Sequence, residues 1–341
     1  MSLPPLAVRT GRAALRASLE DLPAGSLVAV ACSGGADSLA VAATLAFVGR
    51  HAGWRTAAFL IDHNMQAGSA DVTQRAAQQC RDLGIESIVV KQVDVAQGPA
   101  AGGPEAAART ARYAALDELA REHGASAVLL GHTIDDQAET VLLGLARGSG
   151  ARSLAGMRAR KGAYRRPFLT MTRADTEAIC AHEGLSYWTD PTNVDVDGPL
   201  RSQVRGRVLP LLDDVLGPGI TSTLARTAEQ LHEDADLLEQ LGVDALERAI
   251  GGQPGDNSPG DAQITLSVEV LSQEHRAART RALRQAAILA GSPAGTLARR
   301  HIDEVDRLLT HWHGQGPIHL PGPVFVRRQS GNLVLSSHTV N

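Results

Sequence analysis

Residues 26–47 read SLVAVACSGGADSLAVAATLAF, and this stretch decides the fold. The apolar run Ser26–Ala31 predicts a short buried strand, and Leu and Ala recur with helical spacing from Ser38 to Phe47. A turn of Ser and Gly residues separates the two. We therefore expect a strand, a tight loop and a helix in direct succession.

Strands and helices continue to alternate after this first pair. Strands are expected at 56–61, 87–92 and 127–130. One helix is expected at about 70–83, a second between the loop at 97–104 and about residue 123, and a third from His132 to Leu145. The alternation predicts an α/β fold with a doubly wound, mostly parallel, Rossmann-like sheet covered by helices on both faces. Ligands of such sheets lie beyond the carboxyl ends of the strands, which groups residues 33–38, 62–64 and 132–136 around one crevice.

The remainder of the chain predicts a helical segment and a small second domain. Residues 221–249 have a long helical pattern, and a stretch rich in Gly, Pro, Asp and Asn follows at 251–261. Beyond it we expect a strand at 264–268, helices at 274–289 and 298–309, and a hairpin of 324–326 with 333–335. We place the N-terminal domain at 1–215, a helical connector at 216–250, a linker at 251–262 and a small α+β domain at 263–341.

Composition narrows the class of protein. Of the 341 residues 43% are hydrophobic, yet no stretch approaches the roughly 18 to 20 apolar residues of a membrane span, so we expect none. Cys32, Cys80 and Cys180 are too few and too scattered for a disulfide framework or a CxxC site, which favours the reducing cytoplasm. His311 and His313 have no third ligand nearby in the sequence, so no structural metal is predicted.

Basic residues concentrate in one segment although the net charge is −4. No acidic residue occurs from Val141 to Ala174. The basic residues of this segment are Arg147, Arg152, Arg158, Arg160, Lys161, Arg165, Arg166 and Arg173. We interpret the segment as a candidate surface for a phosphate backbone.

The loop at 33–38 has the composition of an oxyanion site. Gly34 and Gly35 allow the backbone to approach a ligand closely, and the following helix directs unpaired N–H groups and a partial positive charge toward it. The lysine and the spacing of a Walker loop are absent. We expect phosphate to bind here, although similar turns also occur without a ligand.

A second candidate site lies at a later transition from strand to helix, GHTIDDQAET at 131–140. Asp136 and Glu139 are three residues apart and share a helix face, with Asp135 beside the first turn. Carboxylates in a first helical turn are common because they offset the helix dipole. Beside a phosphate loop and His132, however, such a cluster can bind magnesium, hold an ammonium group or remove its proton.

The loop resembles the SGGxDS loop of the PP-loop ATP pyrophosphatases, which cleave ATP to AMP and pyrophosphate. This resemblance implies that Ser33, Gly35 and Ser38 hold pyrophosphate and that Asp37 supports the nucleotide and Mg²⁺. The nucleotide site expected in full comprises Ser33, Gly34, Gly35, Ala36, Asp37, Ser38, His63, Arg109 and His132.

Several separated motifs are together similar to those of the tRNA(Ile)-lysidine synthetases, closely over residues 25–215 and loosely beyond. They are SGGADS (33–38), DHNMQAGSADVTQRAAQQC (62–80), PEAAARTARY (104–113), GHTIDDQAET (131–140), RGSG (147–150), RRPFL (165–169) and WTDPTN (188–193). The similarity implies an AMP-forming ligase that makes a carbon–nitrogen bond. ATP adenylates the wobble cytidine of tRNA(Ile) with a CAU anticodon, and L-lysine then displaces AMP to form lysidine.

The resemblance also implies roles for individual residues. Arg112, Asp136 and Glu139 match the lysine site of the family, and with Asp37 they are the expected catalytic residues. Asp37 and Asp136 are the expected Mg²⁺ ligands. The residues expected to contact tRNA are Arg147, Arg165, Arg166, Arg201 and Arg205, together with the accessory domain at 263–341. The family commonly has RNxxR where this chain has RSQVR at 201–205, which weakens any role assigned to Ser202.

Two alternative functions stay open, as does the oligomeric state, for which a homodimer is one alternative. The first function is another PP-loop enzyme, such as a tRNA thiolase, an NAD synthetase or a GMP synthetase. The cysteines form no catalytic pair, and no glutaminase domain is evident to supply ammonia. The second is a nucleotide-binding module without catalysis, because a fold does not fix function. The cluster of Asp135, Asp136 and Glu139 argues against it.

Overall fold

The structure, a computed structural model, describes residues 3–63, 68–94, 104–148, 150–189, 198–250 and 263–337. The expected linker at 251–262, most of the expected loop at 97–104 and parts of three motifs (64–67, 149 and 190–193) lie outside these residues. Two compact units are present, residues 1–232 and 233–341. The division falls inside α10 (Ile220–Ile250), within the segment expected as a helical connector. In the described part of the chain, no helix is both long and apolar enough to cross a membrane.

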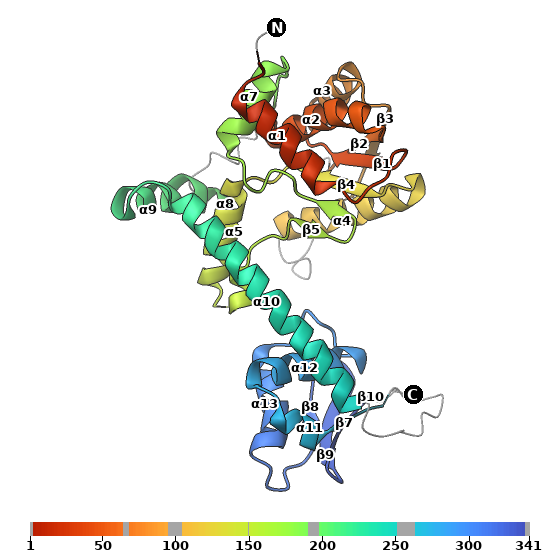
Figure 1. Cartoon of the computed structure of the whole chain (residues 1–341), viewed down its shortest axis with the longest axis vertical. Helices are drawn as coiled ribbons and strands as arrows, with labels where there is room; N and C mark the ends of the chain where they lie inside the picture. The colour runs from red at the N-terminus through yellow and green to blue at the C-terminus, as the bar shows by residue number, and fades with distance from the viewer. Residues whose placement is uncertain are drawn as a thin grey trace. The chain divides into compact units, whose positions relative to one another are not determined.

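A six-stranded, mostly parallel sheet forms the centre of the first unit (Figure 1). Its strands are β1 (Leu27–Ala31), β2 (Arg55–Asp62), β3 (Ser87–Gln92), β4 (Ala127–Leu130), β5 (Arg160–Lys161) and β6 (Tyr164–Arg165). They lie in the order β3-β2-β1-β4-β6-β5, and only β5 runs antiparallel to its neighbour. The predicted doubly wound α/β fold is confirmed, and the strand order reverses direction at β1, where such sheets bind ligands.

Helices bury both faces of this sheet, and the side chains of each strand point alternately to one face and the other. On one face, Val28, Val30 and Leu129 belong to a core shared with α1 (Leu6–Ser18), α2 (Ala36–Ala52), α3 (Ser69–Asp82) and α7 (Arg173–His182). On the other face, Phe59 and Val128 share a core with α4 (Pro104–His123). The sheet is therefore rigidly held, and the loops at its carboxyl edge carry the polar residues.

The remaining elements of the first unit support the region that follows β4. They are α5 (Ile134–Ala146), α6 (Ala151–Leu154), α8 (Leu200–Gln203), the π-helical turn η3 (Val204–Val208) and α9 (Leu209–Leu216). Ala138 of α5 packs with Val204 and Leu209 in a small separate core, so the segment around η3 rests on α5. The sequence did not predict α6 to α9 or the short strands β5 and β6.

The second unit is built on an antiparallel sheet in the order β7-β10-β9-β8. Its strands are β7 (Ile264–Ser267), β8 (Ile318–His319), β9 (Val324–Gln329) and β10 (Asn332–Ser337), and its helices include α11 (Val268–Gln273), α12 (Arg276–Leu289) and α13 (Arg299–Thr310). Leu266, Leu283 and Val326 lie in its core with Ala245 and Ala249 of α10. The predicted small α+β domain and its hairpin, β9 with β10, are confirmed.

Candidate active site

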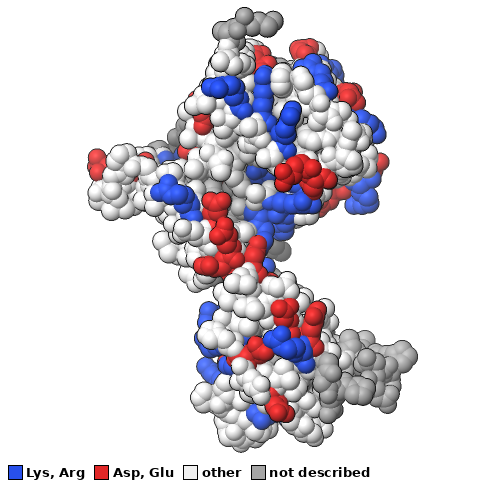
Figure 2. Space-filling model, viewed as in Figure 1, with Lys and Arg blue, Asp and Glu red and all other residues white. Residues whose placement is uncertain are grey.

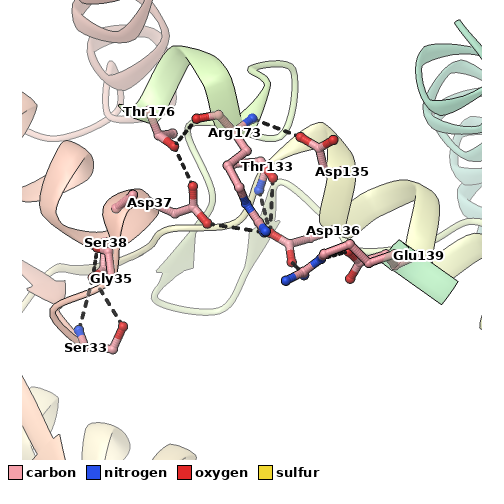
Figure 3. Close-up of polar contacts among 12 residues, drawn as sticks. Ser33, Gly35, Asp37, Ser38, Thr133, Asp135, Asp136, Glu139, Arg173 and Thr176 are labelled. Carbon is pink, nitrogen blue, oxygen red and sulfur yellow. Dashed lines mark hydrogen bonds and ion pairs between the residues drawn. The ribbon is translucent and has the colours of Figure 1, made fainter. Parts of the chain in front are cut away.

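The loop between β1 and α2 is held in shape by its own hydroxyl groups (Figure 3). Ser38 Oγ accepts a hydrogen bond from the Ser33 amide at 3.1 Å and donates one to the Gly35 carbonyl at 3.0 Å. Gly34 has φ +83°, a conformation that favours glycine. Gly35 is the N-cap of α2 and no side chain caps the helix, so its first N–H groups remain available to an anion.

A pocket of about 720 Å³ lies where β1, β2 and β4 end. Its walls include Ser33 and Ser38 of the loop, His63 after β2, Arg112 of α4 and His132 after β4. The apolar part of the lining includes Phe59, Ile61, Leu116 and Leu130. A mostly apolar cavity of this size with a few convergent polar groups suits a nucleotide. The structure thus brings residues after three different strands around one crevice.

Two imidazole rings line this pocket, and each has one nitrogen without a hydrogen-bond partner among the residues that the structure describes. These atoms are Nδ1 of His63 and Nδ1 of His132, and both are buried. Burial lowers the pKa of His132 to about 3. Burial, together with the nearby Arg112, also lowers the pKa of His63. Both rings are therefore neutral at pH 7, and each can offer its free nitrogen to a bound ligand.

Asp37, at the start of α2, is held by residues of α7 (Figure 3). Its Oδ1 accepts a hydrogen bond from Thr176 Oγ1 at 2.6 Å, and its Oδ2 lies 3.7 Å from Nη2 of Arg173. Burial raises the pKa of Asp37, although Thr176 and Arg173 act in the opposite direction. The side chain is thus positioned between the phosphate loop and α5 with its carboxylate only partly exposed.

The two aspartates of α5 have different partners. Asp135 accepts a hydrogen bond from the Arg173 amide at 2.9 Å, which ties α5 to α7. Asp136 Oδ2 accepts hydrogen bonds from the amide and the hydroxyl of Thr133, at 2.9 and 3.2 Å, and so caps its own helix. Burial opposes ionisation of Asp136, but the Thr133 amide and Arg201 help to hold its pKa below the usual range. Asp136 is therefore ionised at pH 7 and better suited to hold a cation than to accept a proton.

Glu139 is completely buried and lies between two arginines. Nε of Arg201 donates to its Oε2 and Nε of Arg205 donates to its Oε1, each at 2.6 Å. Arg201 also donates to Thr140 Oγ1 at 3.1 Å, and Arg205 Nη2 lies 3.6 Å from Asp136 Oδ1. Arg201 and Arg205, which were expected to contact tRNA, thus bind Asp136 and Glu139 in this structure. Both oxygens of Glu139 are occupied.

Two further arginines expected to contact RNA, Arg165 and Arg166, are buried. Arg165 lies 3.2 Å from Asp21 and donates to the Gly162 carbonyl, while Arg166 donates to the Arg158 carbonyl at 2.8 Å. A buried guanidinium already paired in this way cannot meet an RNA phosphate without moving. Arg147, by contrast, is exposed.

The exposed basic residues of the segment from Val141 to Ala174 still form a candidate RNA surface. They are Arg147, Arg152, Arg158, Arg160 and Lys161. Figure 2 shows basic side chains gathered on the face of the first unit around β5. Because these cations lie at the surface, they can reach a phosphate backbone without unfolding.

The two arginines of α4 that the sequence singled out lie in different environments. Arg112 lines the nucleotide pocket. Arg109 is exposed and lies over the Tyr113 ring, 5.0 Å from its centroid, and it is not part of the pocket lining. The structure therefore brings Arg112, but not Arg109, to the pocket wall.

Sequence reasoning missed the contribution of α7. Arg173 and Thr176 both hold Asp37, yet Arg173 was noted only as part of a basic segment and Thr176 was not noted. A local signal was present, because Thr172 and Asp175 form a capping box with hydrogen bonds of 2.9 and 3.2 Å. A Thr three residues before an Asp is the sequence pattern of a capping box, which indicates the start of a helix.

Asp37 and Asp136 are the carboxylates that we expected to bind a magnesium ion. They lie near enough for the charge of Asp136 to act on Asp37. Within the described residues, no group of three metal-ligating side chains occurs. Magnesium usually takes only one or two carboxylates and completes its shell with water and substrate phosphates. Two carboxylates beside a phosphate loop are therefore consistent with the expected ligands.

Two glycines allow the loop to be tested without changing a charge. A Cβ on Gly131 would lie 2.7 Å from backbone atoms of Asp37 and Ser38, whereas a Cβ on Gly35 would meet nothing closer than 3.8 Å. We expect Gly131→Ala to destabilise the protein by at least about 2 kcal/mol through overpacking. Gly35→Ala should fold normally and bind ATP roughly tenfold more weakly, because its methyl group crowds the anion site.

Thermal unfolding and equilibrium dialysis with ATP would measure the two effects. Gly295→Ala is a matched control, since nothing lies within 4 Å of its added Cβ. Normal ATP affinity in Gly35→Ala would show that the nucleotide phosphates lie elsewhere.

Comparisons with known proteins cover both units. A PP-loop domain family matches residues 11–212, and a TilS substrate binding domain family matches residues 266–334. A tRNA(Ile)-lysidine synthase of Thermobifida fusca is 49% identical over 337 residues, which cover 99% of this chain and 100% of that protein. The tRNA(Ile)-lysidine synthase of Streptomyces coelicolor is 49% identical over 317 residues, covering 92% and 86%.

One solved structure is similar at the level of the fold. The U34-tRNA thiolase NcsA from Methanococcus maripaludis matches with a TM-score of 0.56 and 18% sequence identity, covering 67% of this chain and 80% of its own. At this identity the likeness shows a shared architecture and does not extend to the reaction.

Proposed function

Since this chain belongs to the tRNA(Ile)-lysidine synthase family, we propose that it joins L-lysine to the wobble cytidine of tRNA(Ile) with a CAU anticodon. Members of this family are ligases that use ATP, and the chain carries both the PP-loop domain and the substrate binding domain. We place the reaction in the cytoplasm, where tRNA and ATP are available. A homodimer stays a prediction that sedimentation would test.

One observation supports this proposal above the others. The nucleotide pocket and the acidic cluster share the turn between β4 and α5, where His132 lines the pocket and Asp136 begins the cluster four residues later. Asp37 connects the pocket with the acidic cluster, because it belongs to the phosphate loop and is held by Thr176 and Arg173 of α7. A bound ATP and a bound ammonium group would therefore meet at one place.

The first chemical step is adenylation of the cytidine. The C2 carbonyl oxygen attacks the α-phosphorus of ATP, an oxygen–phosphorus bond forms, and pyrophosphate leaves. Ser33, Ser38 and the N-terminus of α2 hold the departing phosphates. His63 and His132 are neutral and add hydrogen bonds without adding charge. While the triphosphate is bound, a Mg²⁺ held by Asp37 and Asp136 would supply positive charge to the phosphates.

The second step forms the carbon–nitrogen bond. The ε-amine of lysine attacks C2, the C2–O bond breaks and AMP leaves with that oxygen, and the nitrogen keeps one hydrogen in lysidine and releases the other as a proton to solvent. Free lysine has a pKa of about 10.4, so the amine must be deprotonated before it attacks. Asp136 holds an ammonium group of lysine, and Arg112 at the pocket wall can bind the lysine carboxylate. Glu139 acts mainly by ordering Arg201 and Arg205.

The tRNA approaches across the exposed part of the basic segment. We assign Arg147, Arg152, Arg158, Arg160 and Lys161 to the RNA phosphates, because these side chains are exposed. Sequence-specific contacts to RNA usually involve splayed loop bases, which suits an anticodon nucleotide. The second unit serves as an accessory tRNA-binding domain, in line with its match to a substrate binding domain.

Incorporation of radiolabelled lysine into purified tRNA(Ile) tests the proposed function directly. With ATP and Mg²⁺, we expect one lysine incorporated and one AMP and one pyrophosphate released for each tRNA. A tRNA that differs only by uridine at the wobble position is the control and should accept no lysine.

The alternatives predict other products in the same assay. A PP-loop thiolase would incorporate no lysine, although it would still consume ATP. A binding module would retain ATP and release no pyrophosphate. Absence of lysine incorporation by well-folded protein would refute the lysidine proposal.

A further inference from the structure

Three carboxylates at the site are paired with guanidinium groups before any substrate arrives. Three carboxylates, of Asp37, Asp136 and Glu139, lie within 4 Å of three guanidinium groups. The guanidinium groups belong to Arg173, Arg201 and Arg205. A lysine ammonium that approaches these paired carboxylates would be repelled by the nearby guanidinium groups, so it would gain most attraction if one guanidinium moved away.

The three arginines are held with different strength. Arg201 and Arg205 each make a charge-assisted hydrogen bond of 2.6 Å to the buried Glu139. Arg173 Nη2 lies 3.7 Å from Asp37, which is too far for a hydrogen bond, and the Arg173 side chain is 32% exposed. Its backbone amide is fixed separately by Asp135. The Arg173 side chain can therefore leave while α7 stays in place.

Arg173 also occupies the position that a substrate cation would need. Figure 3 shows its side chain extending from the start of α7 toward Asp37 and Asp136. It acts electrostatically on both carboxylates. Asp37 and Asp136 are also the carboxylates of this cluster that no arginine holds with a short side-chain hydrogen bond.

We propose that Arg173 is a placeholder for a lysine ammonium group, which displaces the guanidinium from Asp37 and Asp136 when the amino acid binds. This proposal rests on the proposed function and adds a residue that sets the affinity for lysine. The placeholder keeps two neighbouring carboxylates neutralised in the free enzyme, and it favours a ligand whose cation binds them better than Arg173 does.

The proposal predicts that the affinity for lysine increases when the Arg173 guanidinium is removed. Arg173→Gln and Arg173→Ala should bind lysine about threefold more tightly than the native protein, the order expected of a partly exposed ion pair. Arg173→Lys keeps a cation and should restore nearly native affinity. A merely structural role would leave lysine affinity unchanged or weaken it in all three variants.

The measurement is equilibrium dialysis of the full-length protein with radiolabelled lysine, together with the KM for lysine in the incorporation assay. Arg9→Ala is the control, because Arg9 is an exposed arginine of α1 away from the site. Competition by 6-aminohexanoate and norleucine, which each carry one ammonium group, shows whether the ε- or the α-ammonium group of lysine displaces Arg173. Hexanoate, which carries no ammonium group, should bind the Arg173 variants no more tightly than it binds the native protein.

Each outcome decides the proposal. Tighter binding of lysine by Arg173→Gln and Arg173→Ala, together with nearly native binding by Arg173→Lys, supports the proposal. Unchanged or weaker binding overturns it, and so does a lower KM for Mg²⁺ without one for lysine, because the placeholder would then serve the metal. If the native protein incorporates no lysine into tRNA, the proposed function fails first, and the two failures are thus distinguishable.

Discussion

Asp136→Asn is expected to lower lysine incorporation by about 10²-fold or more, the order expected when one partner of a buried charge pair is lost, while leaving the melting temperature unchanged. The asparagine side chain keeps an oxygen that accepts the hydrogen bonds of Thr133, so the start of α5 stays capped. The substitution removes the negative charge that would hold an ammonium group or a magnesium ion. Lysine incorporation and thermal unfolding of the same preparations measure both parts of this expectation.

Asp175→Asn is a closely matched control. Asp175 caps α7 through Thr172 with the same pattern of hydrogen bonds by which Asp136 caps α5 through Thr133. It carries the same charge and loses it in the same substitution, but no lysine or phosphate role is assigned to it. Equal losses of activity in the two variants would mean that capping, and not the charge at the site, explains the result.

The two half-reactions separate the roles that Asp136 could have. Pyrophosphate release with tRNA but without lysine reports adenylation alone. If Asp136 serves mainly the lysine, Asp136→Asn should retain most of this release and lose the transfer of lysine. Equal loss of both steps would point to the magnesium ion instead, because the metal acts on the phosphates of ATP.

The central sheet could be predicted from sequence because each strand carries a local signal. Residues 127–130 are four consecutive apolar residues between polar turns, and the observed strand β4 has the same bounds. The loop after β1 was equally clear, because glycine and serine stand between a strand and a helix pattern. Both signals lie within a few residues and need no knowledge of the tertiary structure.

The pairings within the acidic cluster were not predictable in the same way. Arg201 and Arg205 are 62 and 66 residues from Glu139 in the chain, and no local pattern indicates that they meet. Arg165 likewise looked like an RNA contact because a count of charges says nothing of burial, and it proved to pair with Asp21, 144 residues away. The sequence therefore located the candidate groups, while their partners depended on the fold.

Glu139→Gln is expected to lower the stability of the first unit by about 3 kcal/mol, or roughly 6–12 °C in melting temperature. Removing one partner of a buried ion pair leaves charge without compensation. Here two guanidinium groups lose the negative charge that they share, and one of them would face the glutamine NH₂ group in place of an acceptor oxygen. We take the lower end of the usual range because Arg201 and Arg205 remain 27% and 21% exposed.

The matched control for this substitution is Glu118→Gln, in the same unit. Glu118 forms an ion pair with Lys91 at 2.5 Å, but its side chain is 46% exposed, so water can replace the lost contact and the melting temperature should barely change. If Glu139→Gln melts like the native protein, the two arginines have found another acceptor, and Asp136 is the nearest carboxylate. Lysine binding would then be impaired at native stability, because Asp136 would no longer be free for an ammonium group.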